Sequence, residues 1–188
     1  MHVHPELQAL DEALVAIQRD AHAFLASLTE SQATWRPHPS AWCVTECFEH
    51  LALTNKTYLV AMQPVATAAR RDNKLRRRPA LPGFFGAWFV RSLEPPSKIR
   101  AKAPKNIQPR TAPSLADAST DFLDSQFAVI NFFRFNADLD LASIRFPNPF
   151  LKGLRFSLAT AFHAIPAHER RHLHQARALL AAYQTKPT

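Results

Sequence analysis

Two histidines near the C-terminus, His168 and His172, stand four residues apart in the run Ala167-His168-Glu169-Arg170-Arg171-His172-Leu173. On an α-helix, side chains at positions i and i+4 lie one above the other on the same face. Both imidazoles could therefore point to one position, as a first-row metal such as zinc requires. Because the chain contains nine histidines, this spacing alone is a weak signal, and a metal site needs a third ligand from elsewhere.

The two histidines also occupy positions that normally belong to the core. Apolar residues of the last segment recur at steps of three and four, and the series includes both histidines: Leu158, Phe162, Ile165, His168, His172, Ala176, Leu179 and Tyr183. A buried imidazole needs a partner for each nitrogen that is removed from water. Either a shared metal or a polar network would supply it. His163 and His174 lie well around the helix from this series and are poor candidates.

The string His168-Glu169-x-x-His172 also matches the zinc metalloprotease motif, in which the glutamate is the general base. The extended motif needs a glycine and a histidine where this chain has Gln175 and Ala178. No acidic residue follows His172, so a downstream third ligand is missing. We therefore expect Glu169 to face a neighbouring helix or to support a ligand through a hydrogen bond.

Cys43 and Cys47 are one helical turn apart, so we expect two free thiols and no disulfide framework. Together with His50 they could form a thiolate-rich zinc site, although a small buried apolar role is the favoured interpretation of Cys47. The sequence shows no motif for Ser-His-Asp catalysis. Three glycines in the whole chain exclude a glycine-rich phosphate loop.

Composition favours helix. The 188 residues are 47% hydrophobic with only three glycines, which predicts a single all-α domain over residues 1–188. No segment has the roughly 18 to 20 uninterrupted apolar residues of a membrane span, and the N-terminus lacks the order of a signal peptide. We therefore expect a cytoplasmic protein.

The positive charge is concentrated in one segment. The chain has a formal net charge of +8, but the stretch from Arg70 to Arg110 holds twelve Lys or Arg against Asp72 and Glu94. Residues 71–113, called here the basic segment, also hold seven of the fifteen prolines and the apolar run Phe84–Val90. We expect an irregular connection with one short helix around Gly83 to Leu93, and no specific nucleic-acid module.

Steps of three and four predict four long helices. They cover Leu7 to Leu28, Cys43 to about Arg70, Ser114 to about Asn136, and Gly153 to Tyr183. Prolines predict loops at Ser31 to Ser40 and at Asp138 to Phe150. Pro166 should kink the last helix just before His168, because it removes a backbone hydrogen bond.

The second helix brings a third histidine inward. If Cys43 occupies the cap position, Glu46 falls three residues later and can reach back to free backbone N–H groups. His50 then belongs to the inner stripe of the helix, whose members are Cys47, His50, Leu51, Thr54, Tyr58, Met62 and Val65. His22 lies off the stripe of the first helix, so we expect it in solvent.

Two separated motifs resemble the DinB-like superfamily, including its YfiT relatives. They are Trp42-x-x-x-Glu46-x-x-x-His50-Leu51 and His168-Glu169-Arg170-Arg171-His172-Leu173-x-Gln175, and the four helices follow in the expected order. The resemblance implies a four-helix bundle in which His50, His168 and His172 hold a divalent metal, Zn, Ni or Mn. The basic segment would then be a long proline-rich connection between helices two and three.

Three imidazoles with an open position are typical of a catalytic metal site. Proteins similar to this one are often homodimers, and those with assigned activity include transferases and isomerases that use low-molecular-weight thiols such as bacillithiol or mycothiol. The chain departs from the family at Cys43, where serine is usual, at Cys47, where an aliphatic residue is common, and in its longer basic segment. The resemblance therefore assigns no particular substrate to this chain.

The leading hypothesis is a metal-dependent enzyme acting on a small molecule, with thiol-dependent transfer or isomerisation ahead of metal-assisted hydrolysis. No catalytic acid or base is assigned; Glu46 and Glu169 are the nearest carboxylates in sequence. The alternative hypothesis is a non-catalytic bundle that binds a partner or an anionic surface through its basic segment.

Overall fold

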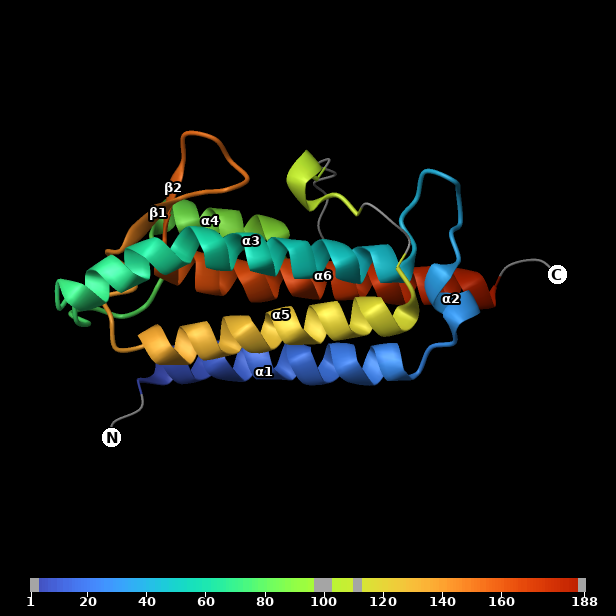
Figure 1. Ribbon diagram of the computed structural model, residues 1–188, viewed down its shortest axis with the longest axis horizontal. Coiled ribbons are helices and arrows are strands. Elements are labelled where there is room, and N and C mark those ends of the chain that lie inside the picture. Colours follow the sequence, from blue (N-terminus) through green and yellow to red (C-terminus); the bar gives the residue numbers. More distant parts are fainter. Residues whose placement is uncertain (1–3, 97–102, 110–112, 186–188) are drawn as a thin grey trace.

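Four long helices run side by side in the computed structural model, which describes residues 4–96, 103–109 and 113–185 (Figure 1). They are α1 (Pro5–Ala26), α3 (Val44–Arg71), α5 (Leu115–Asn136) and α6 (Leu158–Gln184). Three short helical elements, α2 (Glu30–Thr34), α4 (Phe84–Leu93) and η1 (Lys105–Ile107), lie in the connections. Strands in the described residues are limited to the antiparallel pair β1 (Arg145–Pro147) and β2 (Arg155–Ser157). The all-α prediction is confirmed.

The direction of the helices explains the length of the basic segment. α1 and α6 run one way along the bundle, and α3 and α5 run the other way (Figure 1). α3 and α5 pack against each other, so the chain that joins these parallel neighbours must travel back along the bundle. For the 28 residues of α3 that distance is about 40 Å. A short turn cannot span it.

The described parts of the basic segment pack onto the bundle. At its start, the backbone N–H of Arg76 donates to the carbonyl of Asp138, 2.9 Å away. Farther along, α4 lies so close to α6 that a Cβ at Gly86 would sit 2.5 Å from Thr160 Oγ1, which is why only glycine fits there. The Phe89 ring also contacts Phe156 of the hairpin, with centroids 4.8 Å apart.

The core has two apolar regions with a polar layer between them. One region surrounds Phe133 and Phe162, and the other surrounds Phe48 and Phe122. Buried polar residues fall between these regions along the helices: His50, Thr54, Asn55, Ser125, Gln126, Glu169 and His172. Desolvated polar groups are costly unless they are paired, so a layer of this kind marks either a specific network or a binding site.

Helix boundaries and caps follow the sequence prediction in most places. Cys43 and Ser114 precede α3 and α5, and Ser114 Oγ accepts from the N–H of Asp117. The first helix ends at Ala26, two residues earlier than expected, and His22 is exposed as predicted. None of the described helices is both long and apolar enough to cross a bilayer.

Two predictions about the connections are wrong. Residues 31–40 are not all loop, because Thr29 and Gln32 form a reciprocal capping box that starts α2. The last helix begins at Leu158 and not at Gly153. Residues 155–157 pair with the first strand of the hairpin, and Ser157 then caps the helix by accepting from the N–H of Thr160.

Candidate metal centre

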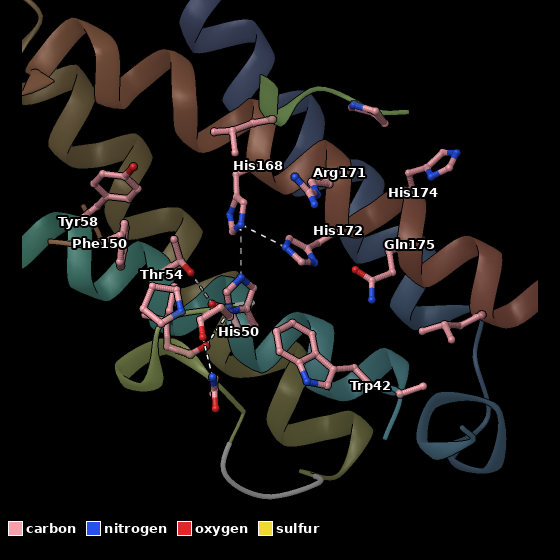
Figure 2. Close-up of a pocket in the computed structure, with 18 of the residues that line it drawn as sticks. Trp42, His50, Thr54, Tyr58, Phe150, His168, Arg171, His172, His174 and Gln175 are labelled. Atoms are coloured by element: carbon pink, nitrogen blue, oxygen red, sulfur yellow. Dashed lines mark hydrogen bonds between the residues drawn. The ribbon is translucent and has the colours of Figure 1, made fainter. Parts of the chain in front are cut away.

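Three histidine rings from two helices meet at one point of the polar layer. His50 comes from α3, and His168 and His172 come from successive turns of α6 (Figure 2). The Nε2 atom of His168 lies 3.3 Å from Nε2 of His50 and 3.1 Å from Nε2 of His172. The three ligand atoms all lie within 4.8 Å of one another. The structure thus brings together all three residues expected from the sequence.

Two sets of contacts hold the start of α3, the helix that carries His50. The carboxylate of Glu46 accepts from the N–H of Cys43 at 2.9 Å, as expected for the acidic member of a capping box. Arg36 donates to both oxygens of the same carboxylate, at 2.6 and 3.0 Å. The packing of α3 against α5 and α6 sets the register that directs position 50 toward α6.

The basic segment orients the His50 ring. Its Nδ1–H donates to the backbone carbonyl of Ile107, 2.7 Å away. A carbonyl oxygen only accepts, so this bond places the proton on Nδ1 and leaves the Nε2 lone pair free to face the other two rings. A hydrogen bond on the far nitrogen is the usual way to orient a metal-binding histidine. Sequence reasoning missed this contact, because a backbone carbonyl leaves no sequence signal.

Burial keeps the three rings neutral. Desolvation lowers the pKa of His50 and lowers that of His168 further, and it lowers the pKa of His172 to about 3. The positive charge of Arg171 adds to the effect at all three rings. Neutral imidazoles with available lone pairs are the form that binds a metal.

The donor set fits a divalent metal ion. Zinc–nitrogen bonds of about 2.0–2.1 Å in a tetrahedral site separate two ligand nitrogens by about 3.3 Å. The two shorter separations, 3.3 and 3.1 Å, agree with this value. Lone pairs of neutral rings repel one another at such distances unless a proton or a cation lies between them. Three converging nitrogens therefore favour a shared cation over a set of ordinary hydrogen bonds.

Neither carboxylate considered from the sequence reaches this point. Glu46 is bound at the start of α3, and Glu169 points between the helices, where its Oε1 accepts from Asn55 Nδ2 at 2.9 Å. Burial raises the pKa of Glu169 to about 8, and its Oε2 has no hydrogen-bond partner among the described residues. The metalloprotease assignment, in which Glu169 would be the general base beside the metal, does not agree with this orientation.

The cysteines and the other histidines of α6 are not members of the cluster. Cys43 and Cys47 are both buried free thiols, and Cys43 Sγ contacts Thr45 Oγ1 at 3.3 Å. His163 donates through Nε2 to the carbonyl of Ala80, 3.1 Å away. A thiolate-rich zinc site with His50 is therefore not formed in the structure.

The three rings border a cavity of about 1050 Å³. The indole of Trp42 forms one side and packs against His50 and His172, with ring centroids 5.0 and 6.1 Å away (Figure 2). Arg171 lies on the α6 side of the same cavity. A small molecule could thus reach the cluster without a rearrangement of the bundle.

The chain matches a known protein family. A family model described as the DinB superfamily matches residues 13–176, which include all three histidines. Neither the curated proteins nor the solved structures contain a match to the chain. The sequence resemblance to this family is confirmed.

Proposed function

Since the chain belongs to the DinB superfamily, we propose that His50, His168 and His172 bind a divalent metal ion and that the protein is a metal-dependent enzyme. The observation that carries this proposal is the convergence of three Nε2 atoms from two helices. The hydrogen bond from His50 to Ile107 supports it, because it orients a lone pair toward the cluster. Zinc, nickel and manganese are the candidate ions.

The proposed reaction is transfer or isomerisation with a low-molecular-weight thiol as cosubstrate, on a small-molecule substrate. When bound, a cation held by three neutral imidazoles lowers the pKa of a thiol or water at its open position, which yields a nucleophile near neutral pH. Around that position, Trp42 packs against the His50 ring and Ile107 fixes the tautomer of His50. Metal-assisted hydrolysis is the second reaction that this site would support.

Metal content tests the proposal. Untagged wild-type protein should carry about one metal ion per chain by elemental analysis, and His168→Ala and His172→Ala should carry almost none. His174→Ala is the matched control, because His174 lies on the same helix and lines the cavity but is outside the cluster. Absence of metal from wild-type protein, after incubation with each of the three ions, would remove the enzyme hypothesis.

A second function is favoured by the outer face of α4. Phe84, Phe85 and Trp88 are 94%, 58% and 57% exposed, an unusual amount of aromatic surface for a water-facing helix. We propose that this face contacts a partner, an anionic surface or a second copy of the chain. Light scattering and vesicle sedimentation separate these roles when wild-type protein is compared with a triple variant, Phe84→Ser, Phe85→Ser, Trp88→Ser. If the wild-type protein is monomeric and does not sediment with anionic vesicles, both the homodimer and the surface-binding role are excluded.

A further inference from the structure

The walls of the cavity are mainly apolar. Leu93 and Pro96 of the basic segment line the cavity, together with Phe150 and Leu151 of the hairpin loop. Trp42 closes the end beside the histidines. The volume, about 1050 Å³, is at the upper end of the range for drug-sized ligands. Walls of this kind favour a ligand with an extended apolar body, because its transfer out of water stabilises the complex.

The described residues that line the cavity carry a positive charge. No Asp or Glu is found among the described lining residues, whereas Arg171 lies beside the histidine cluster (Figure 2). Its guanidinium is partly buried, which strengthens its interaction with an opposite charge relative to a surface arginine. A metal ion on three neutral imidazoles would add to this charge. The polar end of the cavity therefore favours an anionic group and disfavours a cationic one.

We propose that the cavity binds an organic acid whose anionic group meets Arg171 and whose apolar body lies along the wall formed by the basic segment and the hairpin loop. The proposal rests on the proposed function in one respect, since the ligand would be the substrate of the three-histidine site. The basic segment then has a second role beyond connecting α3 with α5: its residues Leu93, Pro96 and Ile107 shape the ligand site.

Matched straight-chain probes test this assignment. Decanoate, decanol and decylammonium have the same apolar body and differ in charge, and binding is measured by calorimetry below micelle-forming concentrations. The wild-type protein should bind decanoate at least tenfold more tightly than decanol, and decylammonium most weakly. Affinity should also rise about threefold for each methylene added from hexanoate to decanoate.

Variants of two arginines locate the anion. Arg171→Gln should weaken decanoate binding by tenfold or more without changing decanol binding, and Arg171→Lys should keep part of the preference. Arg177→Gln is the matched control, because Arg177 lies on the same helix but pairs with Asp20 outside the cavity. Circular dichroism verifies that each variant is folded. An unchanged decanoate affinity in Arg171→Gln, or equal affinities for acid and alcohol, would overturn the proposal.

Measurements with chelated and zinc-loaded protein separate this proposal from the proposed function. A carboxylate can also coordinate the metal, so the preference for decanoate must be present in chelated protein if Arg171 is its cause. Zinc binding without a preference for the acid would reject the ligand class and leave the metal site intact. A preference for the acid in a protein that binds none of zinc, nickel and manganese would reject the metal site alone.

Discussion

One turn of α6 buries polar groups on two faces, and the two faces differ in how those groups are satisfied. His168 and His172 point to the cavity, where the Nε2 atoms of His50 and His172 lie 3.3 and 3.1 Å from Nε2 of His168. Glu169 points the opposite way, between the helices, and accepts from Asn55, which also donates to Gln126. Gln126 in turn donates to the carbonyl of Leu14. The inner face thus forms a network across four helices, in which Glu169 Oε2 has no hydrogen-bond partner among the described residues.

The difference shows that burial of polar groups does not by itself identify a site. The inner network joins α6 with α3, α5 and α1 through hydrogen bonds that the protein itself provides. Such a network specifies how the helices align. The imidazole face brings three ring nitrogens together and opens to a cavity, which is the arrangement expected of a ligand site. We therefore expect substitutions on the inner face to change stability, and those on the imidazole face to change metal binding.

Glu169→Ala should have the largest effect on stability. At pH 5, where Glu169 is protonated in the folded protein, the variant should lose about 2–4 kcal/mol in the free energy of unfolding. The substitution leaves a cavity and removes one acceptor of the Asn55 amide, which keeps its bond to Gln126. Urea denaturation of the chelated protein measures this loss. Glu169→Gln, which keeps the shape and the acceptor, should lose less than about 1 kcal/mol and should still bind one metal ion.

The sequence predicted the imidazole face better than its surroundings. The spacing of His168 and His172, and the position of His50 on an apolar stripe, are local properties of helices and can be found by periodicity. The capping box of α2, Thr29 with Gln32, is also a local sequence signal, although the prolines of residues 31–40 led to the prediction of a loop. The contact from Ile107 to His50 joins residues 57 positions apart through a backbone carbonyl. It depends on the path of the basic segment, which periodicity does not determine.

The two faces should respond to pH with opposite signs in the chelated protein. Burial depresses the histidine pKa values, so the unfolded chain binds more protons below pH 6.5 and stability falls as pH falls from 6.5 toward about 3, the pKa of His172. Burial raises the pKa of Glu169 from 4.5 to about 8. The stabilisation that protonated Glu169 adds to the free energy of unfolding is therefore complete below pH 4.5 and is lost as pH rises to 8. Each group contributes a slope of up to about 1.4 kcal/mol per pH unit.

Single variants separate the two slopes. Glu169→Gln should flatten the stability profile between pH 4.5 and 8 and leave the acid side unchanged. His172→Gln should reduce the slope on the acid side, to which His50 and His168 still contribute, and leave the alkaline side unchanged. Denaturant midpoints at half-unit pH intervals measure both profiles. If either variant altered both sides equally, the two faces would be coupled, and the separation argued above would not hold.

Arg36→Ala should have the smallest effect on the free energy of unfolding. It tests whether the contacts at the start of α3 contribute to stability or to metal binding. Arg36 is about a third exposed in its pair with Glu46, so its loss should cost about 1 kcal/mol in the free energy of unfolding. Glu46 keeps its bond to the N–H of Cys43, and the register of α3 is held by its packing against α5 and α6. Metal affinity measured by competition with a chelator should therefore stay within about threefold of wild type. A larger loss would mean that His50 is positioned by the helix start and not by Ile107, which would extend the imidazole face to the beginning of α3.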